Sequence, residues 1–80
     1  MALDKKEASR RIIIYLESLE NNHVNPDWKN NTIKTLRDYI NDEATAFDVW
    51  RAFEKAPENC FNTEVLIKMN SLKYLFHASL

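Results

Sequence analysis

The feature that most restricts the fold of this chain is the complete absence of glycine from its 80 residues. At average usage, a chain of this length would carry about five glycines. Without them, we expect none of the phosphate-binding loops, dinucleotide-binding turns or nucleophile elbows that need a positive φ or a close approach of the backbone to a ligand. Tight two-residue hairpin turns also favour glycine, and the apolar residues recur at helical spacing. The sequence therefore predicts an all-α fold.

Size and charge restrict the class of protein further. The chain is 45% hydrophobic, carries 11 basic and 12 acidic residues, and has a pI near 6.1, which is typical of one small domain over residues 1–80. A domain of this size buries roughly 60% of its unfolded surface, so most apolar side chains are needed for the core. The apolar runs are too short to span a membrane. Cys60 is the only cysteine and no secretion signal opens the sequence, so we expect a reducing, cytoplasmic location.

The first two predicted helices are marked by their end residues. One begins at Asp4, whose carboxylate can accept a hydrogen bond from the first turn, and ends at Asn21-Asn22. Asparagine is the usual alternative to glycine for a left-handed residue after a helix. The second helix begins at Asn25, which caps it, and ends at Asn41.

The third predicted helix begins at Thr45, where Asp48 completes a capping box, and runs to about Ala56. The fourth is capped by Asn62 or Thr63. With no repeat or linker between them, these segments predict a compact bundle of four short helices. Helical periodicity predicts that its core is formed by Ala8, Ile12, Tyr15, Leu16, Leu19, Trp28, Thr32, Ile33, Leu36, Tyr39, Ile40, Ala46, Val49, Trp50, Phe53, Ala56, Val65, Met69, Leu72, Leu75 and Phe76.

Some apolar residues fall outside these inward stripes. Ile14 lies nearly opposite the buried stripe of its helix, and the last helix carries a second apolar strip formed by Ile67, Tyr74 and Ala78. A single exposed isoleucine is ordinary on a protein surface. A helix with two apolar strips is either the central helix of the bundle or a docking element for a partner. On the second interpretation, the partner-binding residues are Ile14, Ile67 and Tyr74.

No spacing of residues predicts catalysis, a cofactor or a metal site. A structural zinc site needs four ligands close together. The soft metal ligands of this chain are fewer and lie far apart in the sequence, at His23, Cys60 and His77. Acidic residues gather near the turn between the second and third helices, at Asp42, Glu43 and Asp48. They lack the glycine-containing spacing of a calcium loop. Acids near the start of a helix complement its dipole, which explains these residues better. No small-molecule substrate is evident.

Basic residues occur on every predicted helix, interleaved with acids, which is typical of a mixed, solvated surface. The alternative is that those of the second and fourth helices converge into a phosphate-binding strip. Such a strip would consist of Lys29, Lys34, Arg37, Lys68 and Lys73.

Three segments resemble consecutive helices of a known domain. The segments are Asn31-Thr32-Ile33 with Leu36 and Ile40, the run from Glu43 to Val49, and Asn62-Thr63 followed by Leu72, Leu75 and Phe76. They are similar to the second, third and fourth helices of the SAM-like core-binding domain of tyrosine recombinases (phage integrases). That resemblance implies a helical domain that clamps DNA through its second and fourth helices, which maps onto the five basic residues named above. The residues that carry a rival resemblance are Pro26-Asp27-Trp28, Ile40-Asn41 and the run from Lys68 to Leu75. Through them the chain also resembles the ENTH and VHS helical domains of membrane-traffic adaptors.

The sequence as a whole favours a non-enzymatic helical module that binds another protein, or a second copy of itself, through Ile14, Ile67 and Tyr74. This hypothesis rests on the missing catalytic patterns and on apolar side chains that the core does not require. The alternative is a DNA-binding module of the recombinase core-binding type.

Overall fold

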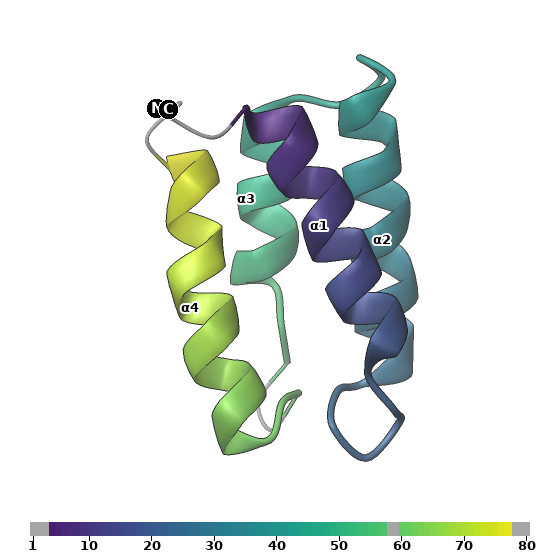
Figure 1. The fold of residues 1–80 in the computed structure, drawn as a ribbon, viewed down its shortest axis with the longest axis vertical. Coiled ribbons are helices and arrows are strands. Elements are labelled where there is room, and N and C mark those ends of the chain that lie inside the picture. The colour runs from purple at the N-terminus through teal and green to yellow at the C-terminus, as the bar shows by residue number, and fades with distance from the viewer. Residues whose placement is uncertain (1–3, 58–59, 78–80) are drawn as a thin grey trace.

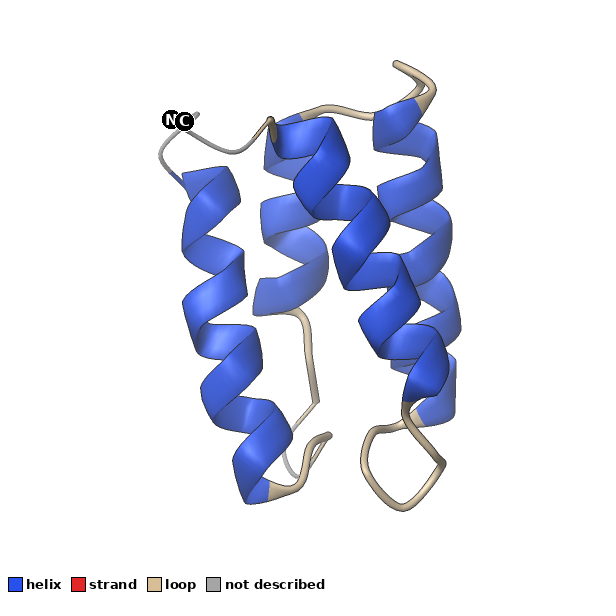
Figure 2. Ribbon diagram, viewed as in Figure 1, coloured by secondary structure: helices blue, strands red, loops and turns tan. Residues whose placement is uncertain are grey.

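Four α-helices joined by loops form the part of the chain that the computed structural model describes, residues 4–57 and 60–77 (Figure 2). The helices are α1 (Lys5–Ser18), α2 (Pro26–Ile40), α3 (Ala46–Glu54) and α4 (Thr63–His77). The predicted all-α bundle of four short helices is confirmed. Within the described ranges, every helix is too short or too polar to cross a membrane.

The helices are arranged as the four corners of a bundle that measures 31 × 23 × 20 Å (Figure 1). α1 packs against α2, α2 against α3, and α3 against α4, while a smaller contact between α1 and α4 closes the ring. α2 and α4 are diagonal to each other: their backbones are not close, but the rings of Tyr39 and Phe76 meet in the core with their centroids 5.8 Å apart. Because α4 occupies a corner, the interpretation of α4 as the central helix is wrong.

The core is formed by inward side chains of all four helices, most of which were predicted, and by Val24 and Cys60 of the loops, which were not. Two residues of α1 were also not predicted: Ile13 is buried, and so is Ser9, whose hydroxyl donates to the Lys5 carbonyl oxygen at 2.8 Å. Several residues predicted to lie in the core are only half-buried at its edge, namely Tyr15, Leu19, Tyr39, Ile40, Ala46, Trp50, Ala56 and Leu72. The side chain of Leu75, also predicted to lie in the core, is outside the described part of the structure. The buried apolar side chains of the described residues are Ala8, Ile12, Ile13, Leu16, Val24, Trp28, Ile33, Leu36, Val49, Phe53, Cys60, Val65, Met69 and Phe76.

The predicted helix starts are confirmed by the hydrogen bonds of their capping side chains. The Asn25 side chain accepts from the backbone N–H groups of Asp27 and Trp28 at 2.9 and 3.1 Å. Of the two residues proposed to cap the fourth helix, Asn62 does so, because its side-chain oxygen accepts from the Val65 N–H at 2.9 Å. These bonds satisfy N–H groups that have no partner within their own helix.

Two predicted helix ends are wrong. α1 stops at Ser18 and Leu19 is extended, so Asn21-Asn22 does not form the left-handed C-terminus expected there. α3 stops at Glu54, two residues before Ala56.

A left-handed residue instead follows α2. Asp42 has a φ of 62°, and the Glu43 N–H donates to the Asp38 carbonyl oxygen at 2.7 Å, as in a Schellman motif. A chain without glycine therefore still reaches positive φ, because aspartate tolerates this region better than most side chains.

A short backbone clasp joins the two loops at one end of the bundle, and no local pattern of residues predicted it. Val24 and Phe61 form an isolated antiparallel bridge. On either side of it, the Asn25 N–H donates to the Cys60 carbonyl oxygen at 2.7 Å, and the Asn62 N–H donates to the His23 carbonyl oxygen at 3.0 Å. The clasp buries Cys60, and this burial raises the pKa of its thiol.

Candidate interaction surface

The exposed large apolar side chains gather mainly on α3 and α4. Phe47 on α3 is 48% exposed, and on α4 Leu66, Ile67 and Tyr74 are 44%, 65% and 58% exposed. Together with the half-buried Trp50, these residues are called the α3–α4 patch below. Ile67 and Tyr74 were predicted from the sequence. The others were missed, although the pair Phe47 and Trp50 on a nine-residue helix was an available signal.

An aromatic contact joins the two helices within the patch. The ring centroids of Trp50 and Tyr74 are 5.9 Å apart, and the planes are tilted by 52°. The ammonium group of Lys73 lies 5.4 Å from the centroid of Trp50 and 5.7 Å from that of Tyr74. The same group forms an ion pair with Glu54 of α3 at 3.8 Å, and only 20% of the Lys73 side chain is exposed. The aromatic part of the patch is therefore held in place before any partner binds.

At the other end of α4, a groove of about 330 Å³ opens beside the patch. It lies between the end of α3 and the start of α4, where Leu66 and Met69 face Phe61 of the connecting loop. A side chain of a partner that covered Leu66 would have this groove beside it.

Ile14 is as exposed as Ile67, at 67%, but it does not belong to the patch. At the surface between α1 and α4, the ring of Tyr15 lies 5.7 Å from the ammonium group of Lys68. Ile14 is turned about 100° from Tyr15 around the helix axis. Its helical neighbours are all polar and exposed, namely Arg10, Arg11, Glu17 and Ser18. The three predicted partner-binding residues therefore separate into a pair on α4 and a single residue on α1.

The predicted basic residues do not come together into one strip, because α2 and α4 are diagonal. Those on α2 have partners within the chain. Lys29 donates to the Leu19 carbonyl oxygen at 3.0 Å, Lys34 pairs with Asp38 at 3.3 Å, and Arg37 pairs with Glu17 of α1 at 3.0 Å. On α4, Lys68 and Lys73 lie on aromatic rings, as described above.

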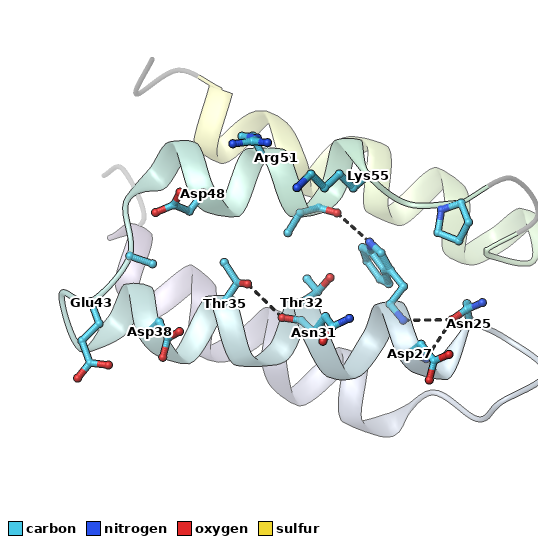
Figure 3. A pocket seen from close by; sticks show the side chains of 14 residues that line it. Asn25, Asp27, Asn31, Thr32, Thr35, Asp38, Glu43, Asp48, Arg51 and Lys55 are labelled. Carbon is cyan, nitrogen blue, oxygen red and sulfur yellow. Dashed lines mark hydrogen bonds between the residues drawn. The ribbon is translucent and has the colours of Figure 1, made fainter.

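A second hollow, the α2–α3 groove, lies on a different side of the bundle and has a volume of about 770 Å³. Figure 3 shows the acidic side chains Asp38 and Glu43 on its α2 side, and on the other side Asp48 and Arg51 of α3 with Lys55, which directly follows α3. Across the groove the Trp28 indole donates to the Ala52 carbonyl oxygen at 2.8 Å. The groove is open and polar.

The acidic residues near this groove have structural roles. Asp48 accepts from the Thr45 N–H at 2.8 Å while its own N–H donates to the Thr45 hydroxyl at 3.2 Å, which completes the predicted capping box. The bond from the Thr45 backbone, followed by that from its hydroxyl, lowers the pKa of Asp48. Asp42 pairs with Lys6 of α1 at 2.7 Å. Over residues 4–57 and 60–77, no three groups of metal-ligating type come together.

The other residues considered as metal ligands are also separate. His23 accepts a hydrogen bond from the Glu20 N–H at 3.3 Å, and Cys60 is buried beneath the loop clasp. The side chain of His77 and the whole of Ala78, which was part of the predicted strip, lie outside the described part of the structure.

Comparison of the chain with models of protein families, with curated proteins and with solved structures gave no match. The resemblances to the recombinase core-binding domain and to ENTH and VHS domains therefore stay predictions.

Proposed function

We propose that the chain is a non-enzymatic helical module that binds another protein through the α3–α4 patch. The observation that carries the proposal is the grouping of four exposed large apolar side chains on two adjacent helices, where Trp50 and Tyr74 are in contact. Aromatic residues and arginine are enriched in protein interfaces, and Arg51 lies over the ring of Phe47 at 5.7 Å.

The cost of removing water from the outward side of α4 is low. Between Ile67 and Tyr74, the outward positions of the helix carry the neutral residues Asn70 and Ser71. Along this line only neutral polar groups would have to be desolvated, because the exposed charges of Glu64 and Lys68 lie before it and to its side, whereas covering apolar surface gains roughly 25 cal/mol per Å². A partner can therefore cover this side of α4 without a compensating ion pair.

Binding to DNA remains the second candidate, on the strength of the recombinase resemblance. The separation of the basic residues on diagonal helices, and the pairing of Lys34 and Arg37 with acids, argue for the protein-binding function instead. A DNA-binding surface normally presents cations together along one face.

The two most exposed isoleucines provide a matched test. Ile67→Asp and Ile14→Asp change the same residue type at nearly equal exposure on different helices. Both variants should keep the helical spectrum and melting curve of the wild type, because neither side chain is in the core. We expect a displayed library of helical peptides to yield binders to the wild-type chain that bind Ile14→Asp equally and Ile67→Asp much more weakly.

Self-association is measured alongside by sedimentation of the same three chains. A dimer that Ile67→Asp dissociates would also support the patch as an interface. If the library yields no binder and the chain stays monomeric, the proposed function is wrong. Binding that is lost in Ile14→Asp and kept in Ile67→Asp would place the interface on α1 instead.

A further inference from the structure

Three cations border the α3–α4 patch, and they are the only cations stacked on aromatic rings in the described part of the chain. Arg51 lies over Phe47, Lys68 over Tyr15, and Lys73 over both Trp50 and Tyr74. An ammonium or guanidinium group held over a ring has already lost part of its freedom of motion, so pairing it with a partner's acid costs less conformational entropy.

We infer that the partner of the α3–α4 patch is an amphipathic helix whose apolar stripe is flanked by acidic residues. This inference rests on the proposed function and adds the chemistry of the partner. It follows from the combination of an apolar centre with a cationic border, because complementary charge at the rim of an interface selects the partner and its register.

The nearby acids of the chain leave this positive border largely in place. Glu54 pairs with Lys73, and Asp48 is held in the capping box of α3 by the Thr45 N–H and hydroxyl. The exposed Glu64 lies one turn before Lys68, but Lys68 forms no ion pair among the described residues; its ammonium group lies over Tyr15. The acids of a partner would therefore find Lys68 and Arg51 available on opposite sides of the patch.

The spacing on α4 suits a helix. Ile67 and Tyr74 are seven residues apart, about 10 Å along the axis, which is the separation of i and i+7 anchors on a partner helix. Lys68 and Lys73 are each turned roughly 110° from the line through Ile67 and Tyr74, one to either side. This arrangement resembles the flanking charged positions of a coiled coil, where acidic residues of one helix meet basic residues of the other.

The same charges disfavour the other occupants. In a symmetric dimer the patch would face itself, so Arg51, Lys68 and Lys73 of one copy would approach the same cations of the other. DNA would place phosphates against the apolar side chains of Phe47, Leu66 and Ile67, which have no hydrogen-bond donor to replace the water that a phosphate loses.

The test selects binders from a displayed library of helical peptides in which both the apolar stripe and the flanking positions are randomised. We expect the peptides selected by the wild-type chain to be enriched in Glu and Asp at the flanks. Replacing those acids by Lys in a selected peptide should weaken its binding about tenfold or more, with a smaller difference at high ionic strength. The double variant Arg51→Glu/Lys68→Glu should reverse the preference, provided that its melting curve shows a folded chain; Lys68→Glu alone serves if it does not.

The possible results separate the two proposals. Selected peptides that depend on Ile67 but have neutral or basic flanks would overturn the inference and leave the proposed function standing. A dimer that Ile67→Asp dissociates, with no peptide selected, would overturn it in favour of a second copy. Salt-sensitive binding of a short DNA duplex that Arg51→Glu/Lys68→Glu abolishes, with no peptide selected, would overturn both.

Discussion

The outward faces of α1 and α4 carry isoleucines of nearly equal exposure in opposite surroundings. On α1, Ile14 is enclosed by exposed polar neighbours, three of which are charged. On α4, Ile67 is followed by Asn70 and Ser71 and then by Tyr74, with Leu66 beside it. Exposure by itself therefore does not identify a binding residue. What distinguishes Ile67 is that its neighbours toward Tyr74 are neutral and can lose their water at little cost, with the charges of Glu64 and Lys68 at the edge, whereas Ile14 has charged neighbours on both of its adjacent turns.

The two helices also differ in how their polar side chains are engaged. α1 is connected to the rest of the bundle by ion pairs, from Glu17 to Arg37 of α2 and from Lys6 to Asp42 after α2. On α4, the ion pair of Lys73 with Glu54 lies against aromatic rings. The outward charges of α1 serve contacts within the chain, and the cations of α4 border apolar surface.

The largest expected effect comes from substitutions in the core. They test whether α1 and α4 are equally well packed on their inward faces and differ only on their outward faces. Leu16 of α1 and Phe76 of α4 are both completely buried. Leu16→Ala should lower the free energy of unfolding by about 2–5 kcal/mol and Phe76→Ala by about 3–5 kcal/mol, because each leaves a cavity in a small core. Denaturant titration measures both. A loss below about 1 kcal/mol for Phe76→Ala would mean that α4 is only loosely docked, and the comparison would fail.

The inward faces could be predicted because helical periodicity fixes them. The buried stripes of α2 and α3, including Leu36 and Val49, follow directly from spacing. Ile13 was missed because it lies at the edge of its stripe, where burial depends on the neighbouring helix. Helix starts were also predictable, since an Asn or Thr cap acts on the next three residues alone.

Features that depend on contacts between distant segments were not predictable. The bridge between Val24 and Phe61 joins loops 37 positions apart, and no local pattern marks it. Likewise, Phe47 and Leu66 belong to one patch only because α3 packs against α4. Ile14 had the sequence signal of a binding residue, and the structure separates it from the others.

A smaller effect concerns the start of α3, which carries Phe47 at one edge of the α3–α4 patch. Thr45→Ala removes both hydroxyl bonds of the capping box and should cost about 1 kcal/mol of stability, with no comparable loss for the exposed α1 substitution Ser18→Ala. Thermal melts would measure the difference. Equal losses in the two variants would show that the cap contributes nothing particular to α3.

The same capping box predicts a dependence on pH. The bonds from Thr45 lower the folded-state pKa of Asp48 below its usual 3.8. The stabilisation is therefore fully present above pH 3.8 and is lost as pH falls through the lower folded-state value. Asp48→Asn, which keeps an acceptor but does not titrate, should remove this part of the acid destabilisation. Acid titrations followed by circular dichroism would compare the variant with the wild type, and parallel curves would contradict the assignment.

The outward side chains themselves should have unequal but modest effects on folding. Tyr74→Ala should cost about 0.5–1.5 kcal/mol, because the ring contacts Trp50 and the ammonium group of Lys73. Ile14→Ala should change stability by less than about 0.5 kcal/mol. Denaturant titration of the two variants gives the difference directly. If Ile14→Ala costs as much as Tyr74→Ala, the outward face of α1 contributes to the fold in a way that its polar surroundings do not explain.

The smallest expected effect comes from the charges that distinguish α1. Glu17→Gln breaks the ion pair with Arg37 of α2, in which both side chains are more than half exposed. Solvent screens such a pair, so the expected loss is about 0.2–1 kcal/mol at low salt and should disappear at high ionic strength. Glu20→Gln, an exposed acid in the loop after α1 with no ion pair among the described contacts, is the control and should show no salt-dependent difference from the wild type. A loss of stability in Glu17→Gln that persists at high salt would mean that the methylene groups of the glutamate pack between α1 and α2. The contribution of Glu17 would then come from packing and not from its charge.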